Sequence, residues 1–237
     1  MMLRSLFCAA ALAAPAVRAQ ERADLIVTNG LVVTMNDKKD VIENGTVVIR
    51  DARIVAVGPR DIARNFTAFK VIDARGGIVL PGMINTHTHV SMTVFRSLGD
   101  DVPDRLTRFI FPLEKNLVDR DIVYWGALHG AMEMIEGGVT TFADMYYFED
   151  EVARAAKKIG LRGVLGETII NFPAPDAAEP YGGLAYAKKF AAQFRGDSLI
   201  TPALAPHAPY TLDAEHLRLI AKEPEALDLP VLMHVAE

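Results

Sequence analysis

Strand-like apolar segments alternate with helix-like segments from residue 78 to the end of this 237-residue chain. The strand-like segments are residues 77–87, 139–147, 162–170, 199–209 and 229–237, and the helix-like ones are residues 121–136, 149–160, 183–194 and 212–223. Strands that alternate with helices in this way pair side by side in parallel, because each helix carries the chain back across the sheet. The sequence therefore predicts an α/β domain with a parallel sheet.

Polar side chains at the ends of these strands distinguish between two parallel architectures. An open doubly wound sheet usually has a glycine-rich turn after its first strand, whereas here Thr86-His87-Thr88-His89 follows. Residues with catalytic potential end several strands: His87, His89, Asp144, Glu167, His207, His234 and Glu237. A (β/α)8 TIM barrel builds its active site at that rim. The sequence therefore favours the barrel over the open sheet.

The length of this region is too short for a whole barrel. Eight strands and roughly 250 residues make a typical barrel, whereas about five strands and 160 residues follow residue 77. We therefore expect residues 78–237 to be the N-terminal part of a barrel, about five of eight strands, in a C-terminally truncated chain. A complete small sheet of five strands is the alternative.

Residues 20–77 have a different pattern, with short β-branched runs separated by turn residues such as Asn29-Gly30. Residues 49–57 predict a hairpin that turns at Asp51-Ala52. A segment this short cannot bury a large core of its own. We expect a small N-terminal β-sandwich domain.

The first 19 residues have the three parts of a secretory signal peptide: Arg4, an apolar stretch from Leu6 to Ala14, and small residues around Ala19. This predicts a secreted or periplasmic protein. The single cysteine, Cys8, lies within that segment, so disulfides and thiolate chemistry are not expected after cleavage. A net charge of −5 without basic runs argues against nucleic acid or a membrane as a partner and leaves a small-molecule substrate.

The two histidines in "NTHTH" are spaced for binding a metal. Alternate residues of a strand share one face, so His87 and His89 point the same way. Neutral imidazoles suit one divalent ion such as zinc, and also iron. His234 ends another strand and supplies a third imidazole. Glu237 follows it closely enough to act as a proton shuttle, whereas His207 is either a fourth ligand or a substrate contact.

The segments "PGMINTHTH", "PLE", "APHAPYT" and "MHVAE" resemble the amidohydrolase superfamily, in the branch of chlorohydrolases, guanine deaminases and 5′-methylthioadenosine/S-adenosylhomocysteine deaminases. The resemblance implies that His87, His89 and His234 bind the ion and that Glu237 is the shuttle. It also implies that His207 contacts substrate and that Glu114 accepts hydrogen bonds from ribose hydroxyls. A carboxylate at a helix start is the alternative reading of Glu114. The resemblance also implies a dimer or larger assembly, so a homo-oligomer is expected.

The sequence departs from this family in two respects. The family completes its metal site with an aspartate after the eighth strand and uses a histidine after the sixth, both of which would lie beyond Glu237. Members that bind a homocysteine carboxylate use an arginine near the end of the third strand, where this chain has Glu167. A carboxylate there would repel S-adenosylhomocysteine.

The function that these features favour is metal-dependent hydrolysis of a C–N bond, namely deamination of a purine-like or other nitrogen heterocycle. Opening of a cyclic amide or dechlorination of a triazine at the same kind of site is the alternative. A third possibility, from another class, is a non-catalytic fragment.

Overall fold

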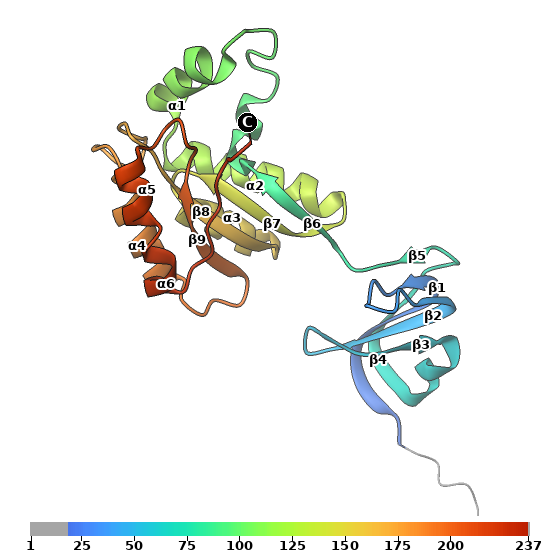
Figure 1. The fold of residues 1–237 in the computed structure, drawn as a ribbon. Coiled ribbons are helices and arrows are strands. Elements are labelled where there is room, and N and C mark those ends of the chain that lie inside the picture. Colours follow the sequence, from blue (N-terminus) through green and yellow to red (C-terminus); the bar gives the residue numbers. More distant parts are fainter. Residues whose placement is uncertain (1–18, 237) are drawn as a thin grey trace, which may run out of the picture. The chain divides into compact units, whose positions relative to one another are not determined.

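A computed structural model describes residues 19–236 of the chain. The predicted signal peptide, apart from its last residue, and the predicted shuttle Glu237 lie outside the described residues. The chain divides into two compact units between Pro81 and Gly82 (Figure 1), a few residues after the predicted boundary. Among the described residues, no helix has the length and apolar character needed to cross a membrane.

The first unit, predicted as a small β-sandwich, contains a mixed five-stranded sheet. Its elements are β1 (Glu21–Val33), β2 (Val41–Arg50), β3 (Arg53–Pro59), the short 3₁₀ helix η1 (Arg60–Asn65), β4 (Phe66–Asp73) and β5 (Ile78–Val79). The order is β3-β2-β1-β4, with β5 also paired to β1. Strands β1, β2 and β3 pair antiparallel, whereas β4 and β5 run parallel to β1. Ile26 and Val48 are the centre of its small core, against which Ile62 of η1 packs.

The turn-like pair Asn29-Gly30 does not end a strand as predicted. It is an irregularity within β1, where the register against β2 shifts and Asn29 adopts a left-handed φ of 59°. A side chain at Gly30 would lie 2.6 Å from Val79, so glycine permits the close approach of β5. The predicted turn at Asp51-Ala52 is confirmed: both residues have positive φ, as a tight two-residue hairpin requires.

The second unit is built on a parallel sheet in the order β6-β7-β8-β9. These strands are β6 (Met83–Thr88), β7 (Val139–Tyr146), β8 (Arg162–Ile169) and β9 (Ile200–Pro206). The apolar segment predicted as the first barrel strand is thus divided. Ile78–Val79 belongs to the first unit and β6 begins at Met83, because Pro81 has no N–H to continue a ladder.

The fifth predicted strand, residues 229–236, follows β9 without forming a regular strand. Leu204 donates to the carbonyl of Pro230 at 3.0 Å and accepts from the Leu232 amide at 2.9 Å. The His234 amide donates to the carbonyl of His207 at 3.0 Å. The segment therefore runs parallel to β9, as predicted, with its polar end beside the end of that strand.

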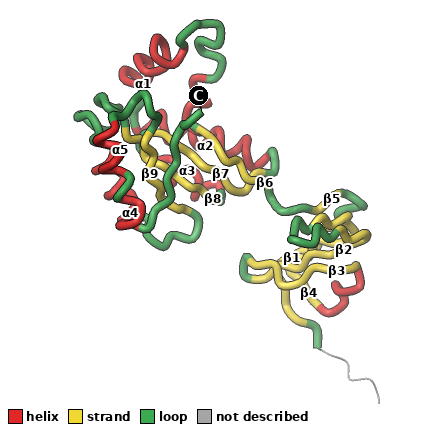
Figure 2. Tube along the Cα trace, viewed as in Figure 1, coloured by secondary structure: helices red, strands yellow, loops and turns green. Residues whose placement is uncertain are grey.

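Helices alternate with the strands, as Figure 2 shows. They are α2 (Arg120–Glu136), α3 (Glu149–Ile159), α4 (Gly183–Gln193), α5 (Ala214–Ile220) and α6 (Glu223–Leu227). Asp119 caps α2 by accepting from the Ile122 amide at 2.8 Å. The last predicted helix, residues 212–223, corresponds to α5, and the short helix α6 begins at its predicted end. The predicted long connection after β6 contains η2 (Val90–Phe95), the π-helical turn η3 (Leu106–Ile110) and α1 (Phe111–Leu117).

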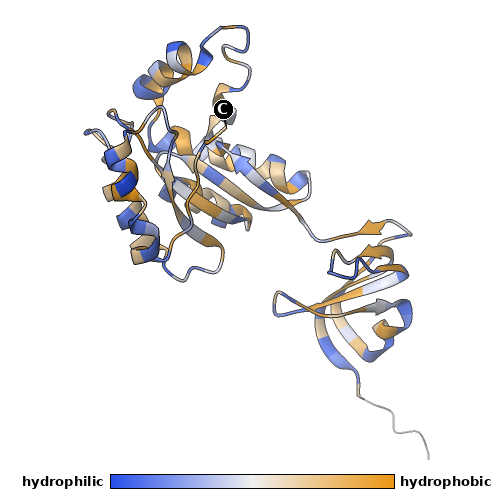
Figure 3. Ribbon diagram, in the orientation of Figure 1, coloured by the Kyte–Doolittle hydropathy of each residue, from blue (hydrophilic) through white to orange (hydrophobic). Residues whose placement is uncertain are grey.

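The core of the second unit lies between the sheet and its helices. Phe142 of β7, Leu165 of β8, Val152 of α3 and Phe190 of α4 are at most 1% exposed and belong to one cluster. Each such side chain contributes about 1.5–3 kcal/mol by leaving water. Figure 3 shows apolar strands and helices that carry hydrophilic residues on their outer sides. This core makes the sheet a rigid support for the residues at its strand ends.

Candidate metal centre

The structure brings the three histidines predicted as metal ligands together. His87 lies in β6, His89 directly follows that strand, and His234 lies in the segment beside β9. Their ring centroids are 5.0–5.1 Å apart in all three pairs. Each offers a ring nitrogen within 4.8 Å of the others. Three imidazoles at one point form a donor set that fits zinc, and equally iron.

The ring of His89 is held in one orientation by the neighbouring strand. Its Nδ1 lies 2.6 Å from the carbonyl oxygen of Met145 in β7. A carbonyl can only accept, so Nδ1 carries the proton and donates it to that oxygen. A hydrogen bond of this kind leaves Nε2 as the nitrogen with a lone pair for a metal. The hydrogen bond to Met145 therefore keeps His89 in the tautomer that can bind a divalent ion through Nε2.

His207 lies beside this group but is not one of the three whose nitrogens converge. Its ring is buried and its centroid is 5.0 Å from that of His234. Its Nδ1 is 2.9 Å from the Thr211 hydroxyl, which itself donates to the carbonyl of Ala208 at 3.2 Å. The hydroxyl oxygen therefore accepts from His207 Nδ1. Because the ring nitrogens that converge belong to His87, His89 and His234, the geometry favours the substrate contact over the fourth ligand for His207. The role itself stays a prediction.

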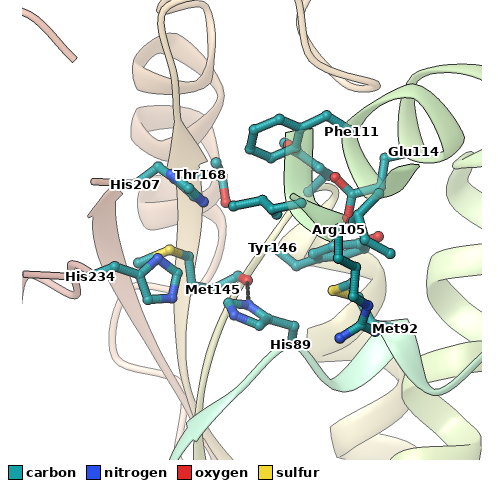
Figure 4. Close-up of a pocket in the computed structure, with 13 residues that line it drawn as sticks. His89, Met92, Arg105, Phe111, Glu114, Met145, Tyr146, Thr168, His207 and His234 are labelled. Atoms are coloured by element: carbon teal, nitrogen blue, oxygen red, sulfur yellow. Dashed lines mark hydrogen bonds between the residues drawn. The ribbon is translucent and has the colours of Figure 1, made fainter. Parts of the chain in front are cut away.

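A cavity of about 270 Å³ opens beside these histidines. Figure 4 shows His207 and His234 on one side of it and Glu114 and Arg105 on the other. The residues that line it come from the ends of the strands and from the segment between β6 and α2: His89, Met92, Arg105, Leu106, Ile110, Phe111, Glu114, Met145, Tyr146, Tyr147, Thr168, His207 and His234. A pocket at this end of a parallel sheet is where a barrel enzyme binds its ligand.

Glu114 lies in the first turn of α1, as the alternative reading predicts, and is also buried at the cavity wall. Burial raises the pKa of this carboxyl from 4.5 to about 7, and the hydroxyls of Tyr146 and Tyr147 partly offset that rise. Glu114 therefore changes its charge near neutral pH, at the place where the sequence predicts a substrate contact.

Several cavity residues were not found from the sequence. Arg105 lies in a segment without periodicity, where no pattern pointed to it. Its Nε donates to the carbonyl of Leu98 at 3.1 Å, and its Nη1 is 3.5 Å from Asp100 Oδ1. Phe111 immediately precedes the "PLE" segment, and its ring centroid is 5.9 Å from that of His207. Its position beside that segment was the available signal.

Glu167 does not face the substrate cavity, so the predicted repulsion of a substrate carboxylate is wrong. Its side chain is fully buried elsewhere, and Oε2 accepts from the Glu149 amide at 3.0 Å. The next residue, Thr168, lines the cavity instead, because successive side chains of a strand point to opposite faces. Asp144, near the end of β7, accepts from the Thr88 hydroxyl and from the Val90 amide and does not line the cavity.

A comparison with protein families decides where this fold belongs. The model described as "Amidohydrolase family" matches residues 78–237, which is most of the chain. The chain belongs to the amidohydrolase family. Its parallel strands and helices are thus part of the TIM-barrel-like amidohydrolase fold.

Relatives of this amidohydrolase are named as deaminases. A 5-methylthioadenosine/S-adenosylhomocysteine deaminase 1 from Syntrophus aciditrophicus is 39% identical over 220 residues, which are 92% of this chain and 50% of that protein. The corresponding deaminase from Syntrophobacter fumaroxidans is 41% identical over 219 residues, which are 91% and 50% of the two chains.

A solved structure gives the same picture. An adenosine deaminase from Xanthomonas campestris with bound zinc matches with a TM-score of 0.86 and 34% identity, over 91% of this chain and 50% of that one. The chain spans about half the length of the curated relatives that it matches.

Proposed function

We propose that this protein is a metal-dependent hydrolase that deaminates an aminopurine nucleoside or a related nitrogen heterocycle. The observation that carries the proposal is the convergence of three imidazoles beside a cavity whose opposite wall holds the buried Glu114. Membership of the amidohydrolase family and relatives named as deaminases support it.

In this proposal His87, His89 and His234 hold one divalent ion. Zinc is favoured over iron because the structurally similar adenosine deaminase contains zinc. A divalent ion would supply Lewis-acid activation of the water that attacks the ring carbon bearing the amine. The hydrogen bond from His89 Nδ1 to Met145 prepares Nε2 of that residue for the ion.

The cavity residues bind and orient the substrate. When ionised, Glu114 accepts hydrogen bonds from sugar hydroxyls. The edge of the Phe111 ring limits where a flat heterocycle can lie, and His207 contacts the reacting ring. Glu237 passes the proton to the departing ammonia.

A direct test is an ammonia-release assay on the full chain supplied with zinc. The substrates are 5-methylthioadenosine, adenosine, S-adenosylhomocysteine, guanine and a chlorinated triazine, the last also assayed for chloride. We expect ammonia from the purine nucleosides, no turnover after chelation and recovery when zinc is returned. Chloride release without ammonia would support the dechlorinating alternative. Tight zinc binding without any turnover would support a non-catalytic role.

Glu114→Gln makes this test specific to the sugar. Losing a charged acceptor costs about 1.5–3 kcal/mol, so kcat/KM for nucleosides falls about 10- to 100-fold. The value for guanine, which has no ribose, changes little. If kcat/KM fell equally for nucleosides and for guanine, the proposed contact between Glu114 and the sugar would be wrong.

We also propose that the protein is exported, on the strength of the three-part pattern in residues 1–19. Fractionation of the producing cells, with N-terminal sequencing of the recovered protein, tests this directly. A mature N-terminus near residue 20 in the exported fraction is expected, and an unprocessed protein in the cytosol would contradict it.

A further inference from the structure

Four carboxyl groups lie together outside the walls of the substrate cavity. Asp144 is near the end of β7, Glu149 is the first residue of α3, Glu167 is near the end of β8, and Asp176 lies in the following loop. The first three are at most 1% exposed and Asp176 is half-buried. Within residues 19–236, no ion pair with lysine or arginine involves any of them. Groups buried at this cost have a structural or functional reason.

Asp144 contacts the chain on both sides of a predicted metal ligand. Its Oδ1 accepts from the Thr88 hydroxyl at 2.6 Å and from the Val90 amide at 2.6 Å. The intervening residue, His89, donates from its ring to the carbonyl of Met145, the neighbour of Asp144. Two consecutive residues of β7 therefore fix both the backbone and the ring of His89.

Glu149 is a second buried carboxyl next to Asp144. Both of its side-chain oxygens are fully buried. Burial and, after it, the charge of Asp144 raise the pKa of Glu149 well above its ordinary value. The carboxyl that contacts the histidine segment is therefore Asp144, and Glu149 lies behind it.

The other two carboxyls tie this pair to the start of α3. The Glu149 amide donates to Glu167 Oε2 at 3.0 Å, and the Phe148 amide donates to Asp176 Oδ2 at 2.9 Å. Phe148 has a left-handed φ of 53°, a conformation that costs a non-glycine residue energy and persists only where neighbours impose it. The hydrogen bonds of the acidic residues supply that constraint.

These carboxyls do not make a second metal site. In the described part of the chain, the group with three ligand atoms close enough for one ion is the histidine trio, and no carboxyl trio meets that criterion. The contacts of Asp144 instead lead to the histidine segment. The cluster is therefore better explained by a structural role toward the histidine segment than by binding an ion of its own.

We propose that Asp144 is a positioning residue for the metal centre, holding the His87–His89 segment in the geometry that binds the ion. This inference rests on the proposed function, since it assumes that the histidines bind a metal. Asp144 is not among the three residues whose ligand atoms converge, and it does not line the substrate cavity.

The test measures metal binding, independently of turnover, in the full chain and in four variants. Asp144→Ala removes the acceptor, and Asp144→Asn keeps an oxygen at the same position. Thr88→Val removes one donor, and Asp119→Asn makes the same chemical change at a helix cap of the same unit. Zinc affinity is measured by competition with a chelator, and ligand geometry by the visible absorption of the cobalt(II) form.

We expect zinc affinity to fall about 10- to 100-fold in Asp144→Ala, as for other outer-shell partners of ligating histidines. Asp144→Asn should recover part of the loss, Thr88→Val should show a smaller loss with an altered cobalt spectrum, and Asp119→Asn should match the parent protein. A folded Asp144→Ala variant with the parent affinity and spectrum would overturn the inference.

Two further outcomes are also decisive. If Asp144→Ala fails to fold, Thr88→Val replaces it, and an unchanged affinity and spectrum in that variant would overturn the inference. If the parent protein binds neither zinc nor cobalt, the proposed metal centre fails, and the inference fails with it. Failure of the proposed metal centre can be told apart from failure of the Asp144 inference alone, because it is seen in the parent protein before any variant is compared.

Discussion

Glu114 should make the stability of this protein depend on pH in a way that a single substitution removes. Burial raises the pKa of its carboxyl from 4.5 to about 7. Between these pH values the folded protein holds a proton that the unfolded chain releases, so the free energy of unfolding falls as the pH rises. At 1.36 kcal/mol per pKa unit, the loss is about 3 kcal/mol, complete above pH 7.

Glu114→Gln keeps the size of the side chain but cannot ionise. The stability of the variant should therefore increase relative to that of the parent protein as the pH rises. The difference in their free energies of unfolding should shift by about 3 kcal/mol in favour of the variant between pH 4.5 and pH 8. Urea denaturation of both proteins at several pH values measures this difference, and titrations common to both cancel.

Glu43→Gln is the matched control, because it makes the same change at an exposed position of β2. Comparing the two variants separates the effect of burial at residue 114 from the chemical change of Glu to Gln. If the difference for Glu114→Gln were flat across this range, Glu114 would not hold a proton in the folded protein. The inference that Glu114 is a buried, neutral carboxyl would then be wrong.

Four other substitutions, one of them a control, test separate parts of the structure. Glu237→Gln should retain zinc, measured by metal analysis, and lose ammonia release; a fully active variant would remove the shuttle assignment. Leu165→Ala, in the core of the second unit, should lower the free energy of unfolding by about 2–5 kcal/mol in urea titrations. Gly126→Ala would place a methyl group 2.3 Å from the carbonyl oxygen of Ser91 and should lower Tm, whereas Gly137→Ala, with its nearest contact at 3.4 Å, should be tolerated.

The convergence of His87, His89 and His234 could be predicted because it follows from general geometry. Alternate residues of a strand share a face, and parallel strands end at the same edge of a sheet. The prediction survives even though residues 229–236 form no regular strand, because backbone hydrogen bonds still align them with β9.

The orientation of Glu167 could not be predicted in the same way. Strand β8 is buried on both faces from Leu165 onward, so apolar and polar residues do not alternate along it and its sequence does not show which residues face the cavity. Arg105 was missed for a different reason: it lies in a connection, where position depends on tertiary contacts rather than on periodicity. Asn29-Gly30 shows the opposite error, since a pair that usually marks a turn can also be accommodated within a long strand.

The backbone holds His87 and His89 more firmly than it holds His234, and this difference has a consequence for the C-terminal segment. His87 and His89 are carried by a strand of the sheet, whereas His234 depends on a segment fixed beside β9 by a few backbone hydrogen bonds. Segments held in this way open locally at lower free energy than a central strand. An ion bound by all three residues would cross-link residues 230–236 to β6 and so disfavour their local opening. Zinc should then slow amide hydrogen exchange at Leu232 and His234 while leaving exchange in β7 unchanged, so that metal supply governs the lifetime of this part of the fold.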